Sequence, residues 1–197
     1  MQNKYKDISF GTAEAVFNKL GGKEGIEKFL RDETKVVEVE VTEFPEFMTI
    51  KIGTHDSVDE LRQSLKDKGN RISSYGNDIL GKIALAETET EVTLHSATVK
   101  ELTGKDVASN REINEAIRSK GYDLCPAEVG PQLRLQYSDQ PSGEYLRVAM
   151  EPIADSDGDL FIFDVNHAYD DRWLDSDGGH PDDRWNGGYR FVFVSRK

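Results

Sequence analysis

The sequence has few of the features that stabilise or anchor proteins outside the cytoplasm. Its 197 residues include one cysteine and six prolines. No apolar run approaches the ~20 residues of a membrane span, and residues 1–11 lack the apolar stretch of a signal peptide. The single Cys125 excludes a disulfide framework within the chain and is consistent with a reducing compartment. We therefore expect a cytoplasmic protein that does not associate with membranes.

Basic residues are scarce relative to acidic ones. The chain contains 25 Lys and Arg against 37 Asp and Glu, a net charge of −12, which disfavours nonspecific binding to nucleic acid. The imbalance is uneven, because residues 151–185 hold eleven acidic and only two basic residues. This acidic segment is therefore the first place to look for a bound cation, a basic partner or the arginines that neutralise it. The sequence contains no signal for an oligomeric state.

Short N-capping motifs predict where helices begin. Ser57 with Glu60, and Ser109 with Glu112, have the spacing of a capping box. Apolar residues at helical spacing follow each motif, and a glycine ends each pattern. By the same criteria we expect helices over residues 12–20, 24–31, 57–69, 73–83 and 109–121, with one or two helical turns after Pro126.

Alternating and continuous apolar runs predict strands. Residues 36–41 and 48–52 alternate and are typical of a hairpin with one solvated face, and residues 87–99 are rich in Thr and Val. Strands are also expected over residues 145–153, 160–165 and 189–194. The pattern indicates an α+β fold, a mostly antiparallel sheet with helices packed on one side. We expect a single domain over residues 1–197, with a weak internal boundary near 122–143, where three prolines interrupt the pattern.

Residues 166–188 carry acidic and aromatic side chains on what the sequence predicts to be a loop of about twenty residues, longer than most connections in compact domains. Aromatic faces stack on ligands, and carboxylates accept hydroxyl or ammonium donors. The candidate binding residues are Tyr169, Asp170, Asp171, Arg172, Trp173 and Trp185. Our leading hypothesis is a non-enzymatic binding protein that recognises a protein partner or a polar small ligand through this loop.

The same acidic segment suggests two alternatives. Carboxylates and histidines suit a divalent cation, so a metal-dependent hydrolase is one alternative, with Asp155, Asp157, His167, Asp170 and His180 as candidate ligands. The EF-hand pattern fails, because the twelfth position from Asp155 is Asn166 rather than Glu. The other alternative is an acidic mimic of nucleic acid that inhibits a basic protein. A divalent cation is the one cofactor that the pattern suggests, and no catalytic residue is assigned.

One N-terminal segment and three C-terminal motifs resemble a group of short bacterial hypothetical proteins with no known function. The resemblance rests on residues 13–26, AEAVFNKLGGKEGI, and on the MEPI, DSDG and RFVF motifs at 150–153, 155–158 and 190–193. These motifs are of the kind that packs a core, and they carry no catalytic residue that transfers to this chain. The resemblance implies a bacterial origin and no particular activity.

Overall fold

The computed structural model describes residues 17–19, 21–31 and 43–196, and the chain divides into two compact units, Met1–Val39 and Glu40–Lys197. In the first unit, helix α2 (Gly22–Leu30) matches the helix expected over 24–31, and none of its residues is buried. An exposed ion pair between Lys28 Nζ and Glu24 Oε1, at 2.8 Å, spans one turn of this helix. Most of the helix expected over 12–20 and all of the strand over 36–41 lie outside the described residues. Residues 122–143 lie wholly within the second unit.

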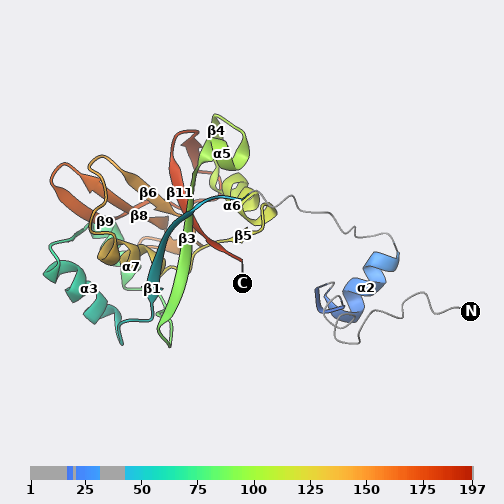
Figure 1. The fold of residues 1–197 in the computed structure, drawn as a ribbon, viewed down its shortest axis with the longest axis horizontal. Helices are drawn as coiled ribbons and strands as arrows, with labels where there is room; N and C mark the ends of the chain where they lie inside the picture. The colour runs from blue at the N-terminus through green and yellow to red at the C-terminus, as the bar shows by residue number, and fades with distance from the viewer. Residues whose placement is uncertain (1–16, 20, 32–42, 197) are drawn as a thin grey trace, which may run out of the picture. The chain divides into compact units, whose positions relative to one another are not determined.

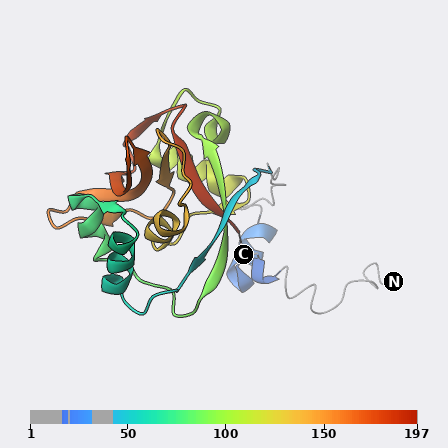
Figure 2. The same ribbon diagram turned by 60° about the vertical axis from the view of Figure 1, so that its left-hand side comes forward.

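The second unit is built on a large mixed sheet. Along the sheet, the strand order is β1 (Glu46–Ile52), β3 (Thr90–Thr98), β11 (Arg190–Ser195), β6 (Tyr145–Val148), β8 (Leu160–Ala168), β9 (Asp171–Gly178) and β2 (Arg71–Ile72). β5 (Tyr122–Asp123) pairs with β11, and β7 (Ile153–Ala154) pairs with β8. Most pairs are antiparallel, but β11–β6 and β2–β9 are parallel. β1 and β3 are the long neighbouring strands in Figures 1 and 2. The α+β class and the mostly antiparallel sheet are therefore confirmed.

The helices described in this unit are α3 (Val58–Asp67), α4 (Ser74–Leu80), α5 (Val99–Thr103), α6 (Asn110–Ser119) and α7 (Val129–Gln136). α3, α4 and α6 begin at serines where the sequence predicts helix starts, whereas the capping box of Thr98 and Glu101 at α5 was not predicted and α7 has no side-chain cap. The Ser57 and Ser73 hydroxyls accept hydrogen bonds from backbone N–H groups in the first turns of α3 and α4. Ser109 and Glu112 form a complete capping box at α6. No helix in the described part of the chain has both the length and the apolarity to cross a bilayer.

Helices α7 and α6 lie close to neighbouring residues of β8. Gly130 of α7 lies against the Phe163 ring, so closely that an added Cβ would come within 2.5 Å of it. Ile162, the preceding residue of β8, instead lines a pocket together with α6. Neighbouring residues in a strand point to opposite faces, so α6 and α7 approach from opposite faces. The continuous apolar run in β8 is consistent with this, because such a strand is covered on both faces.

Helix α7 is anchored by buried polar side chains. Both oxygens of the Glu128 carboxylate, at its N-terminus, accept hydrogen bonds at 2.7 Å, from the backbone N–H groups of Gly53 and Ala86. The Gln132 amide donates to Thr54 Oγ1 at 2.8 Å and to Glu128 Oε1 at 3.1 Å. Glu128 is 1% exposed. A buried carboxylate requires such donors, and here they join α7 to two connections far away in the sequence.

The predicted loop over residues 166–188 is largely strand, and that prediction is wrong. β8 continues to Ala168, Tyr169 and Asp170 make a tight turn, and β9 returns alongside β8. β10 (Arg184–Asn186) then pairs with β4 (Val107–Ser109) in a separate two-stranded sheet. Because Asp and Gly have low strand propensity, the sequence carried no strand signal for β9. β9 pairs with β8 along its length, and β2 pairs with it at Trp173 and Leu174.

Candidate functional site

Arginines from outside the acidic segment neutralise much of its charge. Arg71 pairs with Asp171, Arg111 with Asp182, Arg118 with Glu151, and Arg147 with Asp177. From the sequence, a cation, a basic partner or arginines could balance this charge. These four ion pairs show that arginines of the chain itself balance part of it. The four pairs involve four of the eleven acidic residues of the segment.

The candidate binding residues divide between two places. Tyr169, in the β8–β9 turn, is 93% exposed and has a φ of 55°, a conformation that few residues other than glycine adopt. At the adjoining end of β9, Asp171 Oδ2 lies 2.9 Å from Arg71 Nε, and the Arg71 guanidinium lies 5.5 Å from the centroid of the Trp173 ring. Asp170 shares the turn with Tyr169, and Arg172 is partly buried in β9. Five of the six candidates therefore lie together near the tip of one hairpin.

Trp185, the sixth candidate, is a buried packing residue. It is 6% exposed, and its Nε1–H donates a hydrogen bond to Asn110 Oδ1 at 2.6 Å. Its ring packs edge-on against Tyr189 and Phe191. The same Asn110 amide donates to the carbonyl oxygens of Gly178 and His180. Trp185 thus secures the chain after β9 to the first turn of α6.

The five candidate metal ligands do not form one site. Asp155 Oδ1 accepts hydrogen bonds from the backbone N–H groups of Asp157 and Asp159, within the turn that precedes β8. His167 lies near the other end of β8, about 23 Å along the strand at ~3.3 Å per residue. There its Nδ1 donates to the Gln140 carbonyl oxygen at 2.6 Å. Nowhere in the described ranges do three or more His, Cys, Asp or Glu side chains converge on a position for a metal ion.

His180 and Asp170 are also separate from that turn. His180 Nδ1 accepts a hydrogen bond from the backbone N–H of Asp182, close to the start of α6, whereas Asp170 lies in the β8–β9 turn. The Asp157-Gly158 sequence therefore forms a strand-end turn, as its local chemistry favours, whereas Asp177-Gly178 lies within β9.

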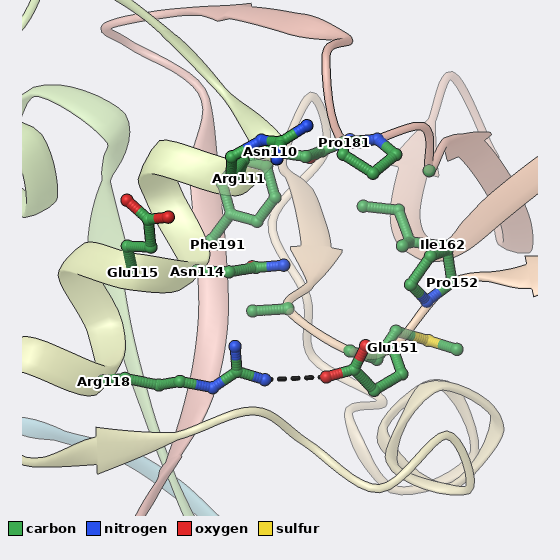
Figure 3. A pocket seen from close by; sticks show the side chains of 13 residues that line it. Asn110, Arg111, Asn114, Glu115, Arg118, Glu151, Pro152, Ile162, Pro181 and Phe191 are labelled. Atoms are coloured by element: carbon green, nitrogen blue, oxygen red, sulfur yellow. Dashed lines mark hydrogen bonds and ion pairs between the residues drawn. The ribbon is translucent and has the colours of Figure 1, made fainter.

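A pocket of about 270 Å³ lies between α6 and the segment that follows β6 (Figure 3). We call it the α6 pocket. One wall consists of α6 residues with a spacing of four, Asn110, Asn114 and Arg118, which therefore share a helix face. The opposite wall contains Glu151 and Pro152 (Figure 3). Its remaining lining includes Ala149, Met150, Ile162, Gly179, Pro181 and Phe191. The pocket therefore combines apolar residues with polar and charged side chains from α6 and from Glu151.

Four charged side chains line the α6 pocket, Arg111, Glu115, Arg118 and Glu151. Arg118 Nη2 donates to Glu151 Oε1 at 2.7 Å across the pocket (Figure 3). Their side chains are 48% and 78% exposed, so the pair is solvated. Exposed ion pairs contribute about 0–1 kcal/mol, so either partner exchanges for a ligand charge at little cost. Arg111, which also lines the pocket, pairs with Asp182 at 3.1 Å.

Asn114 lines this pocket without a hydrogen-bond partner for its amide among the described residues. Its side chain projects from α6 into the cavity (Figure 3), and no hydrogen bond joins it to another described residue. An amide offers one acceptor oxygen and two donor hydrogens. Asn114 therefore has its hydrogen-bonding capacity available to a molecule in the pocket.

The sequence signalled only one side of this site. The capped helix was predicted, and the spacing of Asn110, Asn114 and Arg118 along it was available. No local pattern signalled the other side, where Glu151, with its side chain 78% exposed, pairs with Arg118.

Comparison with family models, curated proteins and solved structures found no match to this chain. The interpretation of the site therefore depends on its geometry and chemistry.

Proposed function

We propose that this chain is a non-enzymatic binding protein, and that the α6 pocket binds a small zwitterion with an aliphatic body, such as the free amino acid leucine. The observation that carries the proposal is the Asn114 amide, which projects without a hydrogen-bond partner among the described residues into a cavity lined by both apolar and charged residues. A concave apolar site with a few convergent polar groups is the usual form of a small-molecule site.

The size of the pocket limits the ligand. A volume of about 270 Å³ corresponds to roughly nine water molecules at ~30 Å³ each, slightly below the usual range for drug-sized ligands. A molecule of about ten non-hydrogen atoms fits that space. Ile162 and Phe191 lie beneath the pocket and are 4% and 1% exposed, so Pro152 and Pro181 would supply most of the apolar contact for an aliphatic chain.

The charges favour a zwitterion over an ion. Arg118 would bind the ligand carboxylate and Glu151 the ligand ammonium group, so both charges of the existing pair stay compensated. A ligand with a single charge would leave Arg118 or Glu151 without its partner. The Asn114 amide would then add a hydrogen bond close to these charged groups.

The test compares three ligands of the same aliphatic skeleton. Leucine carries both charges, 4-methylpentanoate lacks the ammonium group and 3-methylbutylamine lacks the carboxylate. Isothermal titration calorimetry is expected to detect leucine, with each analogue at least tenfold weaker, which is about 1.4 kcal/mol. In thermal unfolding, leucine at ten times its Kd is expected to raise the free energy of unfolding by ~1.4 kcal/mol relative to the protein without ligand.

Two variants locate the binding. Asn114→Leu fills the cavity and removes the amide, and Arg118→Gln removes the carboxylate partner, so both are expected to abolish the leucine signal. Gln63→Leu, on the exposed surface of α3, is the matched control and is expected to bind leucine normally. Equal affinity for leucine and its two analogues, no heat with leucine, or unaltered binding by Asn114→Leu would each refute the proposal.

A further inference from the structure

A second concave surface lies at the end of the sheet where β6 and β11 begin. This groove has a volume of about 460 Å³ and is lined by Gly143–Tyr145, Arg147 and Gly188–Arg190. We call it the tyrosine groove, because Tyr145 and Tyr189 expose 41% and 37% of their surface there. It uses neither α6 nor the residues of the α6 pocket.

Arg147 is held among aromatic rings beside this groove. Its guanidinium carbon lies 4.4 Å from the centroid of the Tyr189 ring, 5.6 Å from that of Tyr145 and 5.5 Å from that of Trp185. The side chain is 9% exposed, so it is nine-tenths buried. These contacts immobilise a long side chain that would otherwise have several rotamers.

The charge of Arg147 is already compensated within the protein. Its Nε and Nη2 both donate to Asp177 Oδ2 at 3.2 Å, and Asp164 Oδ1 lies 4.0 Å from Nε. Asp164 and Asp175 are directly opposite one another on β8 and β9, so further negative charge is close by. The groove is lined by Glu144 as well as by Arg190, so its lining charges of opposite sign, together with the compensated Arg147, favour a neutral ligand.

Several hydrogen-bonding groups of the groove remain available. No described residue accepts a hydrogen bond from Arg147 Nη1, and none bonds to the hydroxyl groups of Tyr145 or Tyr189. The groove thus has a fixed donor nitrogen, two phenol groups and two partly exposed aromatic faces. Aromatic faces with a few placed polar groups are typical of ligand sites.

We infer that the tyrosine groove binds a neutral sugar ring. A pyranose has apolar C–H faces that stack on tyrosine rings and hydroxyl groups that accept from a guanidinium or donate to a phenol oxygen. The orphan donor of Arg147 and the two exposed rings match both properties, and the compensated charge matches the neutrality of the sugar. A groove of about 460 Å³ has room for one or two such rings.

The test uses saturation-transfer NMR with methyl β-D-glucoside, methyl β-D-galactoside, methyl α-D-mannoside and N-acetylglucosamine, together with the anionic methyl β-D-glucuronide. At least one neutral sugar is expected to receive saturation from the protein, and the glucuronide is expected to bind at least fivefold more weakly than the glucoside. In a Trp173→Phe background, Trp185 is the remaining tryptophan, and its contact with Tyr189 makes its fluorescence a second readout of the same site.

Variants assign any signal to the groove. Tyr145→Ala and Tyr189→Ala are expected to lower sugar affinity at least fivefold. Tyr189→Phe keeps the ring that packs on Trp185 and is expected to lose less. Tyr75→Ala is the matched control, because Tyr75 is an exposed tyrosine that stacks on Phe161 away from the groove. No saturation of any neutral sugar, equal binding by the Tyr145→Ala variant, or tighter binding of the glucuronide would each overturn the inference.

Discussion

Replacing Asp164 with asparagine is expected to stabilise the protein at neutral pH. Burial raises the pKa of the Asp164 carboxyl from 3.8 to about 6. Arg147 and a hydrogen bond from Asn166 lower this pKa, whereas the nearby Asp177 and Asp175 raise it. The Asp164 side chain is 5% exposed, and its Oδ1 has no hydrogen-bond partner. Ionisation of this carboxyl group therefore costs the folded state more than the unfolded state.

The sign and size follow from proton linkage. A folded-state pKa above the unfolded value means that the folded protein holds this proton more tightly than the unfolded chain does. The stability that the protonated Asp164 contributes is therefore fully present below pH 4 and is lost as the pH rises through 6. The interval from 3.8 to about 6 corresponds to roughly 3 kcal/mol at ~1.4 kcal/mol per pH unit. Asn is close in shape to the protonated carboxyl group and does not ionise. Asp164→Asn is therefore expected to be more stable than the wild type by up to about 3 kcal/mol at pH 7.5, and equally stable near pH 3.5.

Urea unfolding of both proteins between pH 3.5 and pH 8 measures this difference. Asp157→Asn is the matched control, because Asp157 is exposed and only its backbone N–H is hydrogen-bonded within the turn. That variant is expected to remain within ~0.5 kcal/mol of the wild type across the range. A stability difference for Asp164→Asn that is constant with pH, or one that falls between pH 4 and pH 6, would refute the reasoning.

Two further predictions concern helix α7. Glu128→Gln replaces one of the two acceptor oxygens with an NH₂ group that faces a backbone N–H. The variant is therefore expected to lose about 2 kcal/mol of stability in urea unfolding, and an unchanged midpoint would contradict this. Gly130→Ala places a methyl group against the Phe163 ring and is expected to cost about 1–3 kcal/mol by thermal unfolding, whereas Gly188→Ala, where a Cβ meets no neighbour within 4 Å, should have no effect.

Local chemistry explains why the helices were predictable. A capping box lies within four residues, and the Ser109–Glu112 motif makes both of its hydrogen bonds at the start of α6. The apolar runs of β8 and β11 were equally clear, because strands covered on both faces lose their alternation. β9 was missed for the opposite reason, since its acidic residues are compensated by partners on other strands that no local pattern shows.

The sequence by itself determined the α+β class, the starts of the serine-capped helices and the acidic character of residues 151–185, because each depends on neighbouring residues or composition. The tertiary structure alone decided which arginines neutralise that acidity and which side chains line a pocket. Arg118 meets Glu151 across 33 positions, and Arg147 meets Asp177 across 30. Such contacts depend on strand order and register, which arise from pairing between distant segments. The acidic segment is consequently a set of strands held by arginines from elsewhere in the chain, rather than a free loop.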